Sequence, residues 1–99
     1  MLAKRAEEKF QKQAEFTELY LKRITPIMPE YLKKQEKIVR QMAAERNIQL
    51  EEDEIPYIIQ KAVALELLAI AVKLHAEGRL TPKELVDEYE KCLRKGLGD

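Results

Sequence analysis

The sequence predicts an all-α fold, a small four-helix bundle-like domain in which the third helix is central. The composition supports this prediction, because a chain rich in Ala, Leu, Glu and Lys, with three Gly and no Trp, is typical of helices joined by short connections. Apolar residues recur with helical spacing in four segments, and Pro, Gly and capping residues separate those segments. We expect helices near residues 3–24, 29–46, 54–77 and 82–95, in a single helical domain over residues 1–99.

The first predicted helix carries Phe10, Thr17 and Ile24 at intervals of seven residues, which is the spacing of a helical face and not of a strand. The sequence TPIMPE follows over residues 25–30. Its prolines disfavour the α conformation in the residues before them, and Pro29 suits the first turn of a new helix. We therefore expect a second helix to begin at Pro29, with one kinked helix through both prolines as the alternative.

The segment IIQKAVALELLAIAVKL, residues 58–74, determines the predicted architecture. Thirteen of its seventeen residues are apolar, so apolar side chains cover more than half of the helix circumference. We expect neighbouring helices to cover it on at least two sides. The stripe that carries Glu66 is predicted to face solvent, and the opposite side, with Leu68 and His75, is predicted to face inward.

The same segment is a poor candidate for a membrane span. A spanning helix needs about 20 apolar residues, and a stretch of that length here includes Lys61, Glu66 and Lys73. The first ten residues contain no apolar signal region. With one cysteine, Cys92, the chain has no internal disulfide. We therefore expect a soluble, cytoplasmic protein with no membrane partner.

The clearest local signals surround the fourth helix, in the sequence EGRLTPKEL over residues 77–85. Gly78 suits the position just after a helix end, where φ is positive. Thr81 is the predicted N-cap of the next helix, and Glu84 is expected to complete a T-x-x-E capping box. Gly96 is predicted to end this helix.

Patterns that indicate catalysis or metal binding are missing from the sequence. There is no Ser, and three Gly residues cannot build a phosphate-binding loop. The single His75 and the single Cys92 lack the partner residues of a nucleophilic or zinc motif. An EF-hand register over residues 73–84 places Lys73 in the first calcium-ligand position, which excludes that motif. We expect a protein that is not an enzyme and needs no metal or other cofactor.

The charge distribution leaves binding functions to consider. Residues 1–46 hold eleven Lys and Arg against seven acids, and residues 47–99 hold seven against eleven. This asymmetry either attracts the two halves of one domain to each other or marks a partner surface. We expect a protein–protein interaction module, as a regulatory, inhibitory or accessory subunit, that forms a homodimer. The alternative is a nucleic-acid-binding protein that uses the basic face of the second helix.

Two sets of candidate contacts follow from these interpretations. The third helix is longer than the fourth, so part of its apolar surface, or of the first helix, should stay uncovered in a lone chain. The candidate partner contacts are Phe10, Phe16, Tyr20, Tyr57, Ala64 and Ala71. The candidate nucleic-acid contacts are Lys22, Arg23, Lys33, Lys34, Lys37 and Arg40. A self-contained bundle, in which the other three helices enclose the third, would need no partner.

Overall fold

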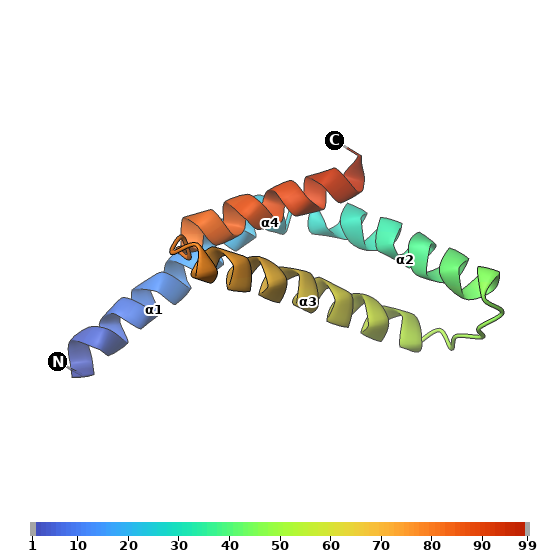
Figure 1. Cartoon of the computed structure of the whole chain (residues 1–99), viewed down its shortest axis with the longest axis horizontal. Coiled ribbons are helices and arrows are strands. Elements are labelled where there is room, and N and C mark those ends of the chain that lie inside the picture. The colour runs from blue at the N-terminus through green and yellow to red at the C-terminus, as the bar shows by residue number, and fades with distance from the viewer. Residues whose placement is uncertain (1, 99) are drawn as a thin grey trace.

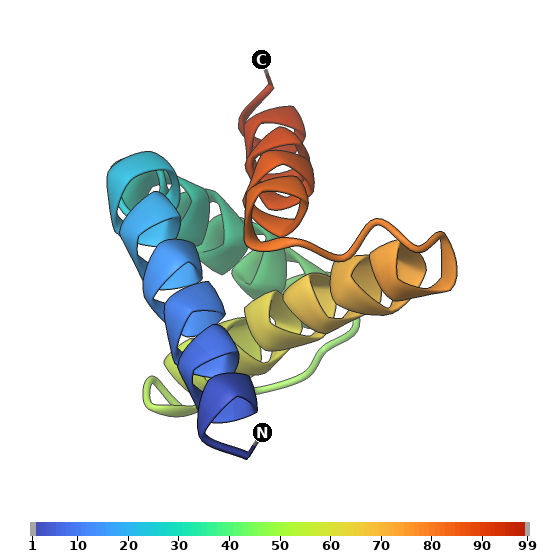
Figure 2. The same cartoon turned by 90° about the vertical axis from the view of Figure 1, so that its left-hand side faces the viewer.

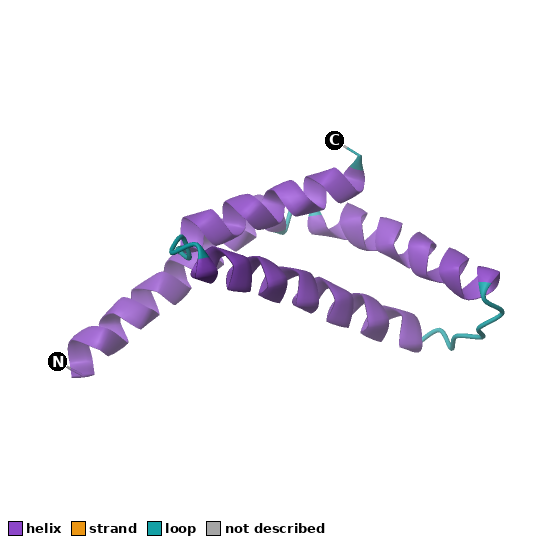
Figure 3. Ribbon diagram, viewed as in Figure 1, coloured by secondary structure: helices purple, strands orange, loops and turns teal. Residues whose placement is uncertain are grey.

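The computed structural model describes residues 2–98, with side chains from residue 5 onward, and within that range it contains helices and no strand (Figure 3). The all-α prediction is confirmed. The elements are α1 (Leu2–Leu19), a short π-helix η1 (Tyr20–Ile24), α2 (Met28–Glu45), α3 (Glu54–Ala76) and α4 (Pro82–Leu97). When η1 is counted with α1, every helix begins and ends within two residues of its predicted position.

The helices form an elongated molecule that measures 56 × 29 × 25 Å. In Figure 1, α2 and α3 are joined by a loop at one end, and the first half of α1 projects from the opposite end. Figure 2, turned so that this half of α1 faces the viewer, shows α4 between α1 and α3. The helix α4 contacts α1, η1, α2 and α3, so it joins the parts of the domain.

The core is built around α4. Its Val86, Tyr89 and Leu93 are at most 1% exposed, and they pack against Ile24 of η1 and Tyr31 of α2. Their spacing of three and four residues places all three on one side of the helix. The helix α3 contacts both α2 and α4, which agrees with the expectation that it is covered on two sides.

The rotation of α3 about its own axis differs from the sequence prediction. Leu68, expected on the inward side, is 58% exposed, and His75 is also exposed. Glu66, expected to face solvent, is half-buried and accepts a hydrogen bond from the buried Tyr31. Because α3 is apolar on almost every side, its spacing gives no single inward face. The buried residues of α3 are Ile55, Ile59 and Leu74.

A π-helix replaces the last turn of the first predicted helix. The Thr25 N–H donates to the Tyr20 carbonyl at 3.0 Å, which is a bond to the fifth preceding residue. The wider turn rotates the residues that follow it relative to a regular α-helix, and Ile24 at its end is fully buried. A turn at residues 25–27 then separates η1 from α2. The two segments are therefore separate helices, and the kinked single helix is excluded.

The connection between α3 and α4 has the predicted caps. Gly78 has a φ of 70°, and the Arg79 N–H donates to the Leu74 carbonyl at 2.8 Å, which is the hydrogen bond of a Schellman motif. The Thr81 hydroxyl accepts from the Glu84 N–H at 3.1 Å. The second hydrogen bond of the predicted capping box is missing, because the Thr81 N–H donates to the Arg79 carbonyl at 3.0 Å. The Glu84 carboxylate instead accepts a hydrogen bond from the Arg79 guanidinium at 2.7 Å.

The helix α4 continues through Gly96, which was expected to end it, and its C-cap is Gly98 with a φ of 90°. Gly96 has a packing role. A Cβ atom at this position would lie 2.7 Å from Cε2 of Tyr31. The missing side chain therefore gives the Tyr31 ring room between α2 and α4.

We predict that Thr81→Ala lowers the free energy of unfolding by about 0.5–2 kcal/mol, because the Glu84 N–H loses its capping acceptor. Chemical denaturation measures this change. Thr17→Ala is the matched control, since the Thr17 hydroxyl donates to the Gln13 carbonyl within an exposed part of α1. An equal loss in both variants would show that the cap contributes nothing specific.

We also predict that Gly96→Ala destabilises the protein. Overpacking typically costs about 1–3 kcal/mol, which offsets the gain of about 1 kcal/mol that Ala offers over Gly in a helix. Lys95→Ala, at the exposed preceding position, controls for helix propensity. A higher thermal midpoint for Gly96→Ala than for the parent would contradict the close approach of Tyr31.

Candidate protein interaction surface

The side of α3 turned away from the core carries a row of exposed apolar side chains. We call this row the α3 outer face. Its members are between 37% and 63% exposed, and they are Tyr57, Ile58, Leu65, Leu68 and Val72. In Figure 1, α4 runs above α3 and no helix is drawn below it. A single chain therefore leaves apolar surface of α3 in contact with water, as the helix lengths predicted.

Lys61 lies within the α3 outer face by its position in the helix. Its Nζ is 4.7 Å from the centroid of the Tyr57 ring, one turn earlier in the helix, which is a cation–π contact. The aliphatic part of a lysine in such a position adds to the apolar surface, and only the amine needs water. The apolar row therefore remains nearly continuous at Lys61, although this residue is charged.

The candidate partner contacts on the third helix have different positions relative to this face. Tyr57 and Ala64 are exposed on it. Ala71 is half-buried at its edge, where it lines a shallow groove with Phe16 of α1 and Leu85 of α4. Four further residues of this face were not among the predicted contacts: Ile58, Leu65, Leu68 and Val72. The available signal was their spacing along one face, but Leu68 was predicted to face inward.

The candidate contacts on the first helix do not form one surface. Phe10 is 73% exposed, near the middle of α1. Phe16 and Tyr20 are half-buried against the core, with ring centroids 5.8 Å apart. The Tyr20 ring also stacks on Tyr89 at 6.4 Å. Phe16 and Tyr20 therefore pack within the chain, and Phe10 is the exposed aromatic residue of α1.

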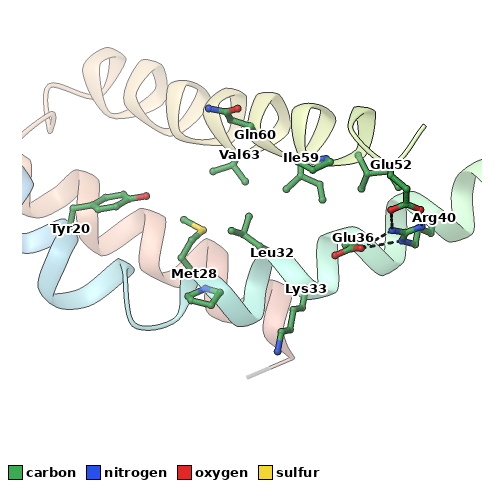
Figure 4. A pocket seen from close by; sticks show the side chains of 13 residues that line it. Tyr20, Met28, Leu32, Lys33, Glu36, Arg40, Glu52, Ile59, Gln60 and Val63 are labelled. Carbon is green, nitrogen blue, oxygen red and sulfur yellow. Dashed lines mark hydrogen bonds and ion pairs between the residues drawn. The ribbon is translucent and has the colours of Figure 1, made fainter. Parts of the chain in front are cut away.

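A second apolar feature is the groove between α2 and α3. Figure 4 shows Met28 and Leu32 of α2 facing Ile59 and Val63 of α3 across it. At one end of the groove lies an ion-paired cluster. Its cation, Arg40, is hydrogen-bonded to two carboxylates, so the groove has apolar walls and an end whose cluster carries one net negative charge. The carboxylates belong to Glu36 at 3.0 Å and Glu52 at 2.9 Å.

Arg23, one of the candidate nucleic-acid contacts, is partly buried and forms ion pairs within the chain. Its guanidinium forms ion pairs with Asp87 and Glu90 of α4. The hydrogen bonds to these carboxylates raise the pKa of Arg23. Both acids come from the acidic second half of the sequence and Arg23 from the basic first half. This contact favours the interpretation that the charge asymmetry attracts the two halves to each other.

Two more of the six candidate cations have partners within the chain. Arg40 pairs with Glu36 and Glu52, and the pairing with Arg40 lowers the pKa of Glu52. Lys34 Nζ donates to the Leu97 carbonyl at the end of α4. The other three cations are exposed and form no ion pair within residues 2–98. They are Lys22, Lys33 and Lys37.

Two buried tyrosines carry the polar groups of the core. The Tyr31 hydroxyl donates to the Glu66 carboxylate, with distances of 2.8 and 3.0 Å to its two oxygens. The Tyr89 hydroxyl has no hydrogen-bond partner among the described residues. Burial raises the pKa of both tyrosines, and for Tyr31 the hydrogen bond to Glu66 adds to this effect. Both hydroxyls are therefore protonated at neutral pH.

Cys92 and His75, the two residues weighed for nucleophilic or acid–base chemistry, have different surroundings. Burial raises the pKa of the half-buried Cys92 thiol, which reduces the thiolate fraction that a nucleophile needs. His75 is exposed in the last turn of α3. Between residues 2 and 98, no group of three or more His, Cys, Asp or Glu side chains could hold a metal ion.

The length and composition of α3 would also allow it to cross a membrane. It is the one described helix of which this is true, and the core helix of a soluble protein meets the same criteria. Glu66 and Lys73 lie within it. Lipid is therefore an alternative to a protein as the binding partner of the α3 outer face, and an experiment on this face has to include lipid vesicles.

We predict that stability falls as the pH rises above 10. The folded state holds the protons of Tyr31 and Tyr89 beyond the ordinary pKa of 10.0, whereas the unfolded chain releases them near that value. This contribution is fully present below pH 10 and is lost as the pH rises toward the folded-state pKa values, by about 1.4 kcal/mol per pH unit for each tyrosine. Denaturation between pH 8 and 11 measures the slope.

Two variants separate the contributions of the tyrosines. Tyr89→Phe should reduce the slope and leave stability at pH 7 equal or higher, because it removes a buried hydroxyl without a partner. Tyr31→Phe should reduce the slope and also lower stability at pH 7, because the Glu66 carboxylate loses its donor. Unchanged slopes in both variants would contradict the burial of these hydroxyls.

The sequence matches no protein-family model, and comparisons with curated proteins and with solved structures give no match either. The function therefore has to be inferred from the surfaces of this chain.

Proposed function

We propose that this chain is a non-enzymatic protein–protein interaction module that self-associates through the α3 outer face. The observation that supports the proposal is the exposed apolar row on that face, whose Leu65 and Leu68 are 63% and 58% exposed. In this role the protein acts as a regulatory, inhibitory or accessory subunit.

The physical argument starts from the cost of exposed apolar surface. Soluble monomers rarely keep large contiguous apolar patches in water, and each Å² removed from water contributes about 25 cal/mol. The α3 outer face lies on a regular helix whose other side is packed in the domain. The backbone that carries these side chains is therefore already ordered, so less conformational entropy is lost on binding than at a flexible loop.

The arrangement of the cations makes nucleic acid the weaker candidate. Phosphate binding needs several cations that are free to replace counterions. Arg23, Lys34 and Arg40 each contact an acceptor within the chain, and Glu36 and Glu30 lie beside the exposed lysines of α2 in the sequence. The surface that remains is mixed in charge, which is typical of the solvated side of a helix.

The test is the mass of the parent and of a double variant, Leu65→Glu with Leu68→Glu, across a hundredfold dilution. Because both leucines are exposed, the variant should keep its helical circular dichroism. Its dimer dissociation constant should rise at least about 100-fold, since burying each leucine contributes about 1.5 kcal/mol or more. Light scattering gives the mass. Ile38→Glu is the matched control, at an apolar residue of α2 that is 47% exposed.

Three results would contradict the proposal. The first is a parent whose mass stays at one chain at every concentration. The second is a monomer that binds phospholipid vesicles and loses this binding in the double variant, which would assign the α3 outer face to lipid. The third is salt-sensitive binding to short duplex DNA with a dissociation constant below about 10⁻⁶ M at physiological salt that Lys33→Glu with Lys37→Glu removes.

A further inference from the structure

We infer that the occupant of the α3 outer face is α3 of a second copy, which runs antiparallel about a two-fold axis between Leu65 and Leu68. This inference rests on the proposed self-association and adds its geometry. It follows from the spacing, the charges and the flanking residues of the face.

The α3 outer face has the spacing of a coiled-coil seam. Counted along the helix, its central positions alternate in steps of three and four residues, which is the a and d pattern of a heptad repeat. These positions are Ile58, Lys61, Leu65, Leu68, Val72 and His75. The steps are three, four, three, four and three residues, so they are the same whether the helix is followed from its N-terminus or from its C-terminus. An antiparallel copy can therefore place its own seam on this one, with Leu65 facing Leu68 of the second copy.

The position of Lys61 favours the antiparallel orientation. In a parallel pair in register, Lys61 would face its own counterpart within the seam, and two like charges would be desolvated together, which is costly. In the antiparallel pair Lys61 faces Val72, and the Cα atoms of the two Lys61 residues are about 16 Å apart along the axis, at about 1.5 Å per residue. Each amine remains beside the Tyr57 ring of its own chain, toward the end of the seam.

The charges at the two ends of α3 favour the same orientation. Asp53 and Glu54 stand at its start, and its last turn carries Lys73 beside the C-cap Glu77. In a parallel pair the two acidic starts would lie side by side, whereas an antiparallel pair separates them by the length of the helix. The two helix dipoles also run in opposite directions in such a pair, so each positive end lies near a negative end.

The residues that flank the seam leave room for close approach. On one side, all three flanking positions are alanines. On the other side, two alanines follow Tyr57, and no flanking position is charged, so charges beside the seam do not oppose either orientation. The flanking residues are Ala62, Ala69 and Ala76 on the first side, and Tyr57, Ala64 and Ala71 on the second.

Disulfide cross-linking tests the orientation. Both variants are made in a chain that carries Cys92→Ala, so that each contains only the cysteine introduced for the test. One variant adds Ile58→Cys and the other adds His75→Cys, two positions that face each other only in the antiparallel pair. Mixed and oxidised, the two variants should form a heterodisulfide dimer. Each variant alone should form none, because identical positions are then about 25 Å apart along the axis, well beyond the Cα separation of about 4.4–6.8 Å in a disulfide.

A third variant provides the matched control. Ile38→Cys, at an exposed residue of α2, should give no dimer when mixed with His75→Cys, which excludes random collision. Homodisulfides in the unmixed Ile58→Cys sample would show a parallel pair, and would overturn the inference while self-association stands. A dimeric protein with no heterodisulfide would place the interface elsewhere. A monomer by light scattering would overturn both the inference and the proposed function.

Discussion

The contact on which the rest of the structure depends is the hydrogen bond from the Tyr31 hydroxyl to the Glu66 carboxylate. Tyr31 is 3% exposed and lies between α2, α3 and α4, in the space that Gly96 leaves open. A carboxylate that is half-buried needs a donor, and Tyr31 provides one. This pairing turns the Glu66 side of α3 toward the core. The opposite side, with Leu65 and Leu68, is then turned toward water.

The connection between α3 and α4 was predictable from the sequence, and the rotation of α3 was not. Gly78 and Thr81 determine backbone conformation within one turn, so their roles follow from their immediate neighbours. The inward face of α3 depends instead on a residue of another helix, 35 positions earlier in the sequence. A helix that is apolar on almost every side carries little internal signal for its rotation. For the same reason, Tyr57 and Ala64 could be predicted as contacts from the sequence, whereas Leu68 was wrongly predicted to face inward.

The π-helix and the charge distribution show the same dependence on distant residues. The pattern of the first helix continues through Ile24 without a sign of a wider turn, and the turn brings Arg23 to Asp87 and Glu90 of α4. An isolated ion pair at a partly exposed site contributes little on its own. Here one guanidinium joins two carboxylates and holds η1 against α4. The basic first half and the acidic second half of the sequence are in this way used to hold one domain together, and fewer cations remain for a polyanionic partner.

The two apolar sides of α3 connect the stability of the domain to its association. The inner side contributes to the core through Ile59 and Leu74, and the outer side through Leu65 and Leu68 contributes only when a partner covers it. Both sides belong to the same rigid helix, so unfolding of α3 removes the core contacts and the interface at once. A partner that binds only the folded chain stabilises it by mass action. The exposed apolar residues of the α3 outer face contribute little to the stability of a lone chain, and in the proposed dimer they would contribute through their burial. This is the physical reason for proposing that the protein binds its partner through the α3 outer face.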